Sequence, residues 1–434
     1  MTSWLELNWQ LIRPFGRYVY YVLFPSRRPR YFQKPWEYPC CRLGTGALPS
    51  QLDSRPSQPA FLFFPMNDWH ARTQRSQQLA KALAQSGHLC IYVNPHLGLE
   101  YPIPYLLSGS SRVCALAQNL LELHIHLPRE HELNQRLLLR SEVSRIVRSI
   151  DEVLSDAGIR QAVSLTSLPV WLDVVEQLRE RHGFPIVYDC HDFLAGFARV
   201  SREVVDSEEQ LMRTCDRVVF SSSCLMETML ERNPALRGKA ALIRNAVNPA
   251  DLQFSESDQG MVPKRVVGYL GGLDHWFDTD AMLEAAREHP SLDFVLVGTV
   301  EDISIFRLKE CPNVRFTGEV PHAELRKHLA TWAVATIPFL RSPLTLAVNP
   351  IKIYEYFSLG LPVVGTRLPE LELFRDLVYI ADTPQQFAAC VAKAIAETDM
   401  SLRARRKALA SRETWTERAN SLFSLIECAR ADSR

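Results

Sequence analysis

The chain has 434 residues, 47% hydrophobic and 23% charged, an ordinary globular composition that excludes a disordered, collagen-like or disulfide-dense protein. Its 49 basic and 49 acidic residues balance, which argues against a dedicated nucleic-acid binder. The ten cysteines include no Cys-x-x-Cys pair, so we expect reduced thiols and a cytoplasmic protein. No uncharged apolar stretch is long enough to span a membrane, and the N-terminus has no signal-peptide pattern.

Residues 1–58 differ from the rest of the chain, with eight lysines and arginines against three acidic residues. An apolar stripe at spacings of three and four is formed by Trp4, Leu7, Leu11, Phe15, Tyr18 and Val22. Cations beside aromatic rings suit a membrane interface, so this basic aromatic arm predicts peripheral attachment to the inner face of a membrane. The alternative is an arm packed on its own domain.

From residue 59 onward, short apolar runs alternate with helical segments, which predicts an α/β fold with doubly wound, Rossmann-like sheets. Residues 59–250 form the first expected domain, with strands over 60–64, 89–95, 161–166, 186–192, 217–223 and 240–249 and a helix over 75–87. The polar segment 251–263 predicts a linker. Residues 264–400 form the second expected domain, with strands over 265–272, 292–299, 314–318, 334–339 and 361–366 and helices over 278–290, 322–332 and 351–360. Residues 401–434 predict one basic amphipathic helix.

Residues 349–366, NPIKIYEYFSLGLPVVGT, carry the sharpest chemical signal. Asn349 is a favoured N-cap and Pro350 a favoured first-turn residue, so a helix should begin here with its positive dipole end open to an anion. Lys352 adds a charge for a phosphate, and Glu355 can accept two hydrogen bonds from a ribose diol. The alternative is an ordinary capped helix with a surface Lys/Glu pair.

Two doubly wound domains and this segment resemble the GT-B glycosyltransferases, in particular the retaining family 4 enzymes, through an Asn-Pro-x-Lys-x-Tyr-Glu-Tyr variant. The resemblance implies two domains that face a cleft and a C-terminal helix that returns to the first domain. It also implies that the second domain holds a nucleotide diphosphate sugar, with Glu355 on the ribose and Val320 near the base. Gly271 and Gly272 would let backbone N–H groups approach the diphosphate.

The second domain departs from the family pattern at two points. The first glutamate of the family's pair would fall at Ala347, and the usual Arg and Lys are replaced by GGLDHWFDTD, residues 271–280. Lys352 would then supply the missing charge. Trp276 and Asp278 are weaker donor candidates, for which packing and helix capping are the alternatives.

In the first domain, YDCHD ends a predicted strand at residues 188–192, on the edge where open α/β sheets bind ligands. The resemblance implies that His191 and Asp192 position the donor sugar and stabilise charge in the transition state. The alternative is a capping aspartate and a hydrogen-bonded histidine. The loop after the first strand would face the acceptor, with candidates Asn67, Asp68, His70, Arg72 and Arg75.

Two weaker metal signals are present. DTD at 278–280 matches an Asp-x-Asp metal motif, but acids suit a helix start and we expect a cap. His124 and His126 share one strand face, yet no third ligand is evident from the sequence. We therefore expect no metal and no cofactor.

The expected function is a metal-independent hexosyltransferase that moves a sugar from a nucleotide diphosphate sugar to a glycan or glycolipid hydroxyl with retention. Its setting would be assembly of a surface polysaccharide or a lipid-linked glycan. Two alternatives are an isomerase of the nucleotide-sugar 2-epimerase type and a non-catalytic nucleotide-sugar-binding subunit. The departures at Ala347 and at 271–280 leave the last alternative open.

Overall fold

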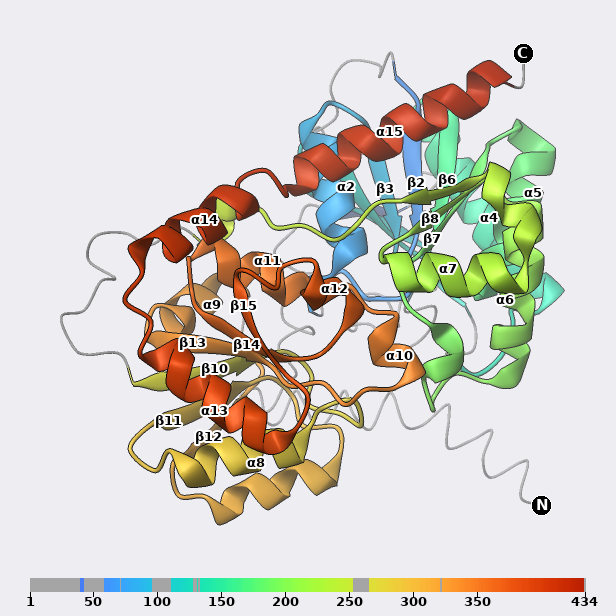
Figure 1. Cartoon of the computed structure of the whole chain (residues 1–434). Coiled ribbons are helices and arrows are strands. Elements are labelled where there is room, and N and C mark those ends of the chain that lie inside the picture. Colours follow the sequence, from blue (N-terminus) through green and yellow to red (C-terminus); the bar gives the residue numbers. More distant parts are fainter. Residues whose placement is uncertain are drawn as a thin grey trace, which may run out of the picture. The chain divides into compact units, whose positions relative to one another are not determined.

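The computed structural model describes residues 40–42, 58–70, 72–95, 111–127, 131, 133–252, 265–320 and 322–432. The apolar stripe of the basic aromatic arm lies outside the described residues, as does most of the expected linker. The chain divides into two compact units, one of Met1–Asp189 with Ala198–Val218 and one of Cys190–Phe197 with Val219–Arg434. Figure 1 labels the helices and strands of both units.

A nine-stranded sheet has the order β1-β4-β5-β3-β2-β6-β7-β8-β9. Its strands are β1 (Cys40–Arg42), β2 (Ala60–Phe64), β3 (Cys90–Val93), β4 (Arg112–Ala117), β5 (Leu120–His124), β6 (Ala162–Thr166), β7 (Ile186–Cys190), β8 (Arg217–Phe220) and β9 (Ala240–Leu242). β2 pairs in parallel with both β3 and β6, as a doubly wound sheet requires. The edge differs from the expected pattern, because β4 pairs antiparallel with β5 and β1 antiparallel with β4.

Local sequence explains where the helices around this sheet begin and end. They are α2 (Arg75–Gln85), α4 (Arg140–Asp156), α5 (Leu172–His182), α6 (Arg202–Thr214) and α7 (Ser223–Arg232). α6 begins where Ser201 accepts a hydrogen bond from the N–H of Val204, and α5 ends at Gly183 with φ of 71°. α4 buries Val143, Ile146, Val147 and Ile150, the spacing of an amphipathic helix.

The second sheet has six strands, paired in parallel throughout, in the order β12-β11-β10-β13-β14-β15. Its strands are β10 (Val266–Leu270), β11 (Asp293–Val297), β12 (Val314–Gly318), β13 (Trp332–Ile337), β14 (Val363–Thr366) and β15 (Val378–Ala381). β10, which comes first along the chain among these six strands, therefore lies inside the sheet, and the strand order reverses between β10 and β13. Open α/β sheets bind ligands beyond the carboxyl ends of the strands at such a reversal.

The helices of this part are α8 (Thr279–Glu288), α9 (His322–Leu329), α10 (Pro343–Leu346), α11 (Ile351–Ser358), α12 (Pro369–Glu372), α13 (Pro384–Ile395), α14 (Met400–Ala410) and α15 (Trp415–Asp432). α8 and α13 pack side by side against the sheet (Figure 1). The single C-terminal helix expected over 401–434 is wrong, because α14 and α15 are separate. Thr414 starts α15 by accepting a hydrogen bond from the N–H of Glu417 at 3.3 Å.

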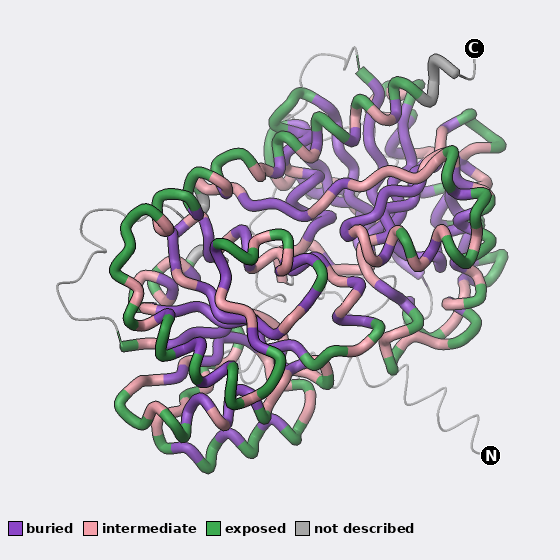
Figure 2. The backbone as a smooth tube through the Cα atoms, viewed as in Figure 1, coloured by how far each residue is buried: buried purple, intermediate pink, exposed green. Residues whose placement is uncertain are grey.

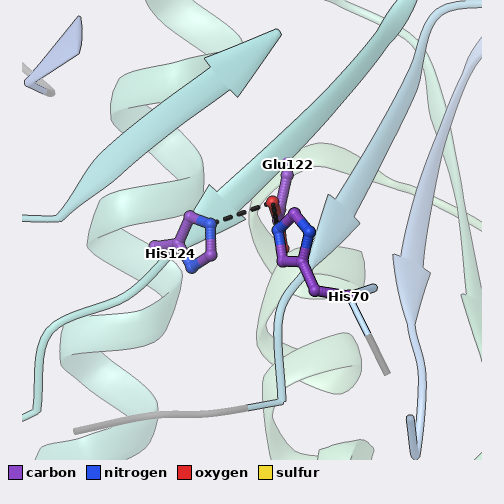
Figure 3. A group of neighbouring side chains, drawn as sticks. All are labelled: His70, Glu122 and His124. Atoms are coloured by element: carbon purple, nitrogen blue, oxygen red, sulfur yellow. Dashed lines mark hydrogen bonds and ion pairs between the residues drawn. The ribbon is translucent and has the colours of Figure 1, made fainter. Parts of the chain in front are cut away.

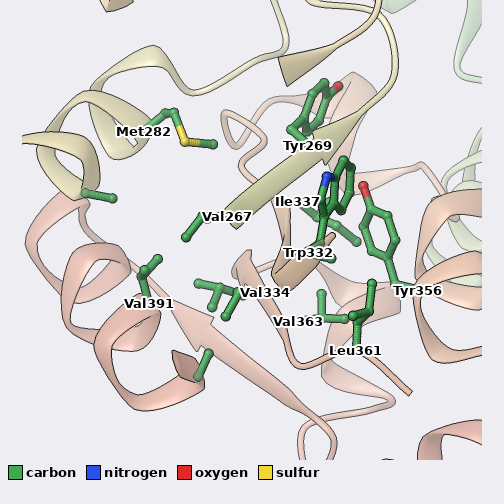
Figure 4. Packing of buried hydrophobic residues seen from close by; sticks show 14 of the residues in the cluster. Val267, Tyr269, Met282, Trp332, Val334, Ile337, Tyr356, Leu361, Val363 and Val391 are labelled. Carbon is green, nitrogen blue, oxygen red and sulfur yellow. The ribbon is translucent and has the colours of Figure 1, made fainter. Parts of the chain in front are cut away.

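The strands are buried along most of their length, whereas the outer faces of the helices are exposed (Figure 2). Trp332 of β13 packs against Tyr356 of α11, with ring centroids 6.0 Å apart (Figure 4). A Cβ at Gly268 would lie 2.0 Å from the Trp332 indole, so only glycine leaves room for this ring on β10. The aromatic core thus fixes the strands whose ends carry the candidate site.

Two expectations from composition can be compared with the structure. Among the helices of the described residues, none is long and apolar enough to cross a membrane. Cys114 of β4 is disulfide-bonded, which corrects the expectation that every cysteine is a reduced thiol. Cys114 lies opposite Cys40 in the antiparallel register of β1 and β4, a proximity that sequence spacing does not reveal.

Candidate active site

A lysine occupies the point where the strand order of the second sheet reverses. The Lys352 Nζ lies 4.4 Å from the Tyr269 ring centroid and 4.6 Å from the Phe339 ring centroid. Tyr269 belongs to β10, and Phe339 follows β13, so the ammonium group sits at the carboxyl ends of the two strands that flank the reversal. A cation held over two aromatic faces at this position is suited to bind an anionic ligand group.

A glycine also lies beside this ammonium group. A Cβ at Gly271, where φ is 139°, would lie 2.8 Å from the Lys352 Nζ. The Tyr269 hydroxyl accepts a hydrogen bond from Lys352 at 3.2 Å and donates one to the carbonyl oxygen of Gly272 at 2.8 Å. Lys352 and the glycine pair predicted from the sequence are therefore brought together at one place.

The amide of Gly271 is already used inside the sheet. It donates to the carbonyl oxygen of Val297 at 2.9 Å, so the expectation that this N–H points at a phosphate is wrong. The carbonyl of Gly271 in turn fills the space beside Gly298, where a Cβ would lie 1.9 Å from that oxygen. These two glycines let the β10 and β11 loops approach closely, and Lys352 supplies the positive charge at the site.

Asn349 holds the start of α11 from within the protein. Its Oδ1 accepts from the N–H of Asn245 at 2.9 Å, and its carbonyl oxygen accepts from the Asn245 side chain at 2.6 Å. Its Nδ2 donates to Glu370 at 2.7 Å and to the Tyr354 hydroxyl at 3.1 Å. Pro350, and not Asn349, is the N-cap residue, and no side chain caps α11. The predicted cap is therefore wrong, because the Asn349 amide binds Asn245 and Glu370.

Glu370 is the residue that sequence reasoning missed. Its buried carboxylate accepts hydrogen bonds from the backbone N–H of Ser223 at 2.9 Å and from the Arg244 Nε at 2.8 Å, in addition to that from Asn349. Arg244 balances its charge, which a buried carboxylate requires. The only sequence signal was an acid after Pro369 in the first turn of a short helix, a pattern too common to single out.

His191 and Asp192 directly follow β7 and belong to the second unit. The Ser221 hydroxyl fixes this turn by donating to the carbonyl oxygen of His191 at 2.8 Å. The His191 Nε2 lies 3.6 Å from an Asp192 carboxylate oxygen, and the two side chains are 10% and 25% exposed. Both polar groups therefore remain partly accessible at the end of a buried strand.

The segment that follows Asp192 contacts helix α10 and the loop after β10. A Cβ at Gly196 would lie 2.7 Å from the Leu344 Cβ, so this turn packs directly on α10. The Phe197 ring meets Trp276 edge-on, with centroids 6.2 Å apart. The turn that carries His191 thus adjoins α10 and the loop after β10 within the same unit.

The position where the family pattern has its first glutamate is structural in this chain. Ala347 is 2% exposed and ends α10. Its carbonyl oxygen accepts a hydrogen bond from the Ser222 hydroxyl at 2.5 Å. The residue here has only a buried methyl side chain, which cannot bind a sugar as a carboxylate would.

The other residues of the second domain that were predicted to bind the donor or a metal lie in half-buried or helix-capping positions. Glu355 and Val320 are both half-buried, and Val320 packs against the hydrophobic core. Asp278 caps α8 by accepting from the N–H of Ala281 at 2.9 Å, and burial raises its pKa. Asp280 pairs with Arg307 at 3.0 Å. The predicted cap in DTD is therefore confirmed.

In the first unit, the loop after β2 is held by a side chain that was not predicted. The Gln77 Nε2 donates to the carbonyl oxygens of Asp68 and Arg72, at 3.0 and 2.9 Å. The carbonyl oxygen of Asn67 accepts from the Tyr92 hydroxyl at 2.7 Å. His70 contacts a buried carboxylate of β5. The loop is therefore fixed by hydrogen bonds before any ligand binds.

Arg75 does not share this loop's environment. Its Nε lies 2.9 and 3.0 Å from the two carboxylate oxygens of Asp189, and both side chains are almost wholly buried. Its assignment as an acceptor-binding residue is therefore replaced by a structural one. The partner lies 114 residues away in the chain, which is why sequence spacing did not reveal the pair.

The comparison with known families identifies the part of the chain that carries Lys352. Residues 264–397 match the family described as "Glycosyl transferases group 1", so this segment is a glycosyltransferase group 1 domain.

Solved structures share the fold over most of the chain. The sucrose-phosphate synthase of Thermosynechococcus elongatus has a TM-score of 0.66, is 16% identical, and matches over 86% of this chain and 100% of its own. The HepE protein of Anabaena, solved with UDP and glucose, has a TM-score of 0.61, is 15% identical, and matches over 85% of this chain and 100% of its own. These likenesses show that the chain has the fold of these proteins, which is the GT-B fold.

One curated relative is TuaH of Bacillus subtilis (strain 168), which is provisionally named a teichuronic acid biosynthesis glycosyltransferase. It is 28% identical over an alignment of 263 positions, and the match covers 56% of this chain. The match spans 65% of the length of TuaH.

Proposed function

We propose that the protein is a GT-B glycosyltransferase that transfers a hexosyl group from a nucleotide diphosphate sugar to an acceptor hydroxyl. The observation that carries the proposal is the Lys352 ammonium group at the strand-order reversal of a glycosyltransferase group 1 domain. Lys352 would bind the diphosphate, Glu355 the ribose, and Val320 would lie beside the base. The glycine at 272 would allow the diphosphate to approach the backbone.

Finer features of the proposal follow the family 4 resemblance through the Asn-Pro-x-Lys-x-Tyr-Glu-Tyr segment. Transfer would proceed with retention and without a metal in the reaction. His191 and Asp192 would orient the sugar and stabilise the positive charge that develops as its bond to the diphosphate breaks. In this scheme Asn349 acts as a positioning residue for α11, because its amide is bonded within the protein.

The acceptor would be a growing surface polysaccharide or a lipid-linked glycan. The name of TuaH supports this setting, since teichuronic acid is the product of its named pathway. Asn67, Asp68 and Arg72 on the fixed loop of the first unit are the proposed acceptor contacts. The proposed location is the cytoplasm, with residues 1–58 on the inner face of the membrane.

A second candidate is a non-catalytic subunit that binds a nucleotide sugar. The buried Ala347 favours it, because the chain has no carboxylate at the position where the family's first glutamate helps to place the donor sugar. The donor site proposed above is common to both candidates. Turnover therefore separates them, and binding alone does not.

The test is a panel of nucleotide sugars, beginning with UDP-sugars, followed by thermal unfolding, because a true donor stabilises the folded state by mass action. Glu355→Gln should lose that stabilisation, and Glu288→Gln, an exposed glutamate of α8, should keep it. A chelator tests metal independence, and NMR of the product's anomeric centre tests retention.

Turnover is then measured as nucleoside diphosphate release with and without a glycan acceptor. Acceptor-dependent release supports the transferase. Conversion of the donor sugar without an acceptor would identify the isomerase instead. Binding without either reaction would leave the non-catalytic subunit.

A further inference from the structure

Three side chains of the first unit converge on one buried point (Figure 3). Glu122 and His124 lie two residues apart on β5 and so share a face of that strand. His70 reaches them from the loop after β2. A carboxylate oxygen of Glu122 lies 2.8 Å from the His70 Nε2 and 3.0 Å from the His124 Nε2. The three side chains are between 0% and 3% exposed.

The carboxylate of this cluster is held in place by a further residue. Asn94, which follows β3, donates from its side chain to the other Glu122 oxygen at 2.6 Å and to Asp68 at 3.3 Å. Asp68 also accepts from the backbone N–H of His70 at 2.5 Å. Outer contacts of this kind orient metal ligands in known sites.

In the absence of a metal ion, the two imidazoles act directly on the carboxylate. Burial on its own would raise the pKa of Glu122, but the imidazoles of His124 and His70 outweigh burial and hold that pKa well below its usual range. A bound metal ion would take the place of the protons between these imidazole nitrogens and the carboxylate, because histidine binds metal ions in its neutral form. The two imidazole rings lie nearly parallel, 4° apart, with centroids separated by 6.4 Å.

We propose that His70, Glu122 and His124 bind one divalent transition-metal ion, with Zn²⁺ the best match. Two imidazole nitrogens and one carboxylate oxygen are a common zinc ligand set, whereas Mg²⁺ and Ca²⁺ prefer oxygen ligands alone. The ligand atoms lie within 4.8 Å of one another. Ligands around a tetrahedral zinc are about 3.4 Å apart, so the 2.8 and 3.0 Å contacts of Glu122 with the two imidazoles would each open by about half an ångström.

The ion would fasten the loop after β2 to β5. Its site lies within the first unit and uses none of the residues of the proposed donor site. The inference is thus independent of the proposed donor binding and of the proposed metal independence of transfer, and it shares only Asp68 with the proposed acceptor contacts.

The test uses full-length, untagged protein that has been treated with EDTA and then freed of chelator. Zn²⁺ is titrated in competition with a chromophoric zinc indicator, and Co²⁺ is added separately to record its visible absorption. We expect one Zn²⁺ per chain, a tetrahedral Co²⁺ spectrum and no competition from millimolar Mg²⁺. Glu122→Gln and His124→Gln should each weaken Zn²⁺ binding more than about 100-fold.

His126→Gln is the matched control, because His126 lies two residues beyond His124 and is outside the cluster. It should bind Zn²⁺ like the wild type. Far-UV circular dichroism of each metal-free variant shows whether it folds, and His70→Gln, in a loop, provides an alternative if the β5 variants do not. Absence of Zn²⁺ binding by the wild type, or equal losses in His126→Gln and the ligand variants, would overturn the proposal.

Discussion

The side-chain amide of Asn349 donates to the carboxylate of Glu370 at 2.7 Å, and both residues are at most 1% exposed. This bond ties Asn349, two residues before the start of α11, to the carboxylate that also binds Arg244 and the N–H of Ser223. The buried Glu370 carboxylate thus holds the start of the helix that carries Lys352 and Glu355. Its hydrogen bonds go to Asn349, Arg244 and Ser223.

Replacing Glu370 with glutamine tests this arrangement. The substitution keeps the shape but removes the negative charge and puts an NH₂ group in place of one of the two oxygens that accept hydrogen bonds. We expect the free energy of unfolding to fall by about 2–4 kcal/mol in urea denaturation. Glu372→Gln on the same short helix, whose partner Arg367 is 43% exposed, should cost less than about 1 kcal/mol. Equal costs would contradict a special role for Glu370.

Lys352→Met removes the charge of Lys352 and keeps an apolar side chain to pack on Tyr269 and Phe339. We expect affinity for nucleoside diphosphates to fall about 10- to 100-fold, because one charge-assisted contact is lost. Binding of the uncharged nucleoside should hardly change. Isothermal titration calorimetry measures both. Lys309→Met is the control, since Lys309 lies 4.0 Å over the Phe306 ring in a similar cation–π contact. The idea fails if both variants bind diphosphates equally well.

Gly298→Ala probes the close approach of the β10 and β11 loops. Its Cβ would meet the carbonyl oxygen of Gly271 at 1.9 Å, and φ is 147°. We expect a loss of about 2–5 kcal/mol in the free energy of unfolding. Gly87→Ala is the control, because φ is 90° there but no atom lies within 4 Å of the added Cβ. Its cost should be only that of the backbone, about 1–2 kcal/mol. Calorimetric melting of both variants would show a reversed order if the steric account were wrong.

Glu142 should make the stability of the first unit depend on acid pH. Burial alone would raise its pKa, but hydrogen bonds from Arg136 and from the N–H of Leu139 outweigh burial and lower it. A lowered folded-state pKa gives stability that is fully present above the unfolded value of about 4.3 and is lost as pH falls through the folded value.

Glu142→Gln should therefore cost about 1 kcal/mol at pH 7, and the difference from wild type should shrink toward pH 3. Urea denaturation at several pH values measures it. Glu209→Gln removes an exposed partner of Arg213 and should cost less than about 0.5 kcal/mol. A Glu142→Gln cost that is constant from pH 7 to pH 3 would reject the assignment.

Strong local patterns allowed much of the fold to be predicted. The strands over 60–64 and 314–318 are found with the predicted bounds, because a continuous apolar run defines the first and alternation of apolar with polar residues the second. The β4–β5 hairpin was missed, since its turn at Asn119 has φ of 56° without a glycine to mark it. β15 and α13 were also not anticipated as separate elements.

The candidate site was predictable only where a local motif marks each residue. Lys352, in its helix-start motif, falls near Gly271, at a strand end, as expected. Contacts made over long distances in the chain were not. His70 and Glu122 are 52 residues apart, and nothing in the spacing of His124 and His126 indicates a partner in the earlier loop. Which side chains meet is decided there by the order of strands in the sheet.

The buried carboxylate at residue 370 also has a consequence for synthesis of the chain on the ribosome. Ser223 and Arg244 are made 147 and 126 residues before Glu370, so at usual elongation rates they wait about 10 s for their partner. A fragment that begins at residue 264 would never acquire them, whereas one that begins at residue 219 would. Recombinant work on nucleotide binding should therefore place its N-terminal boundary before α7, well upstream of the matched family segment.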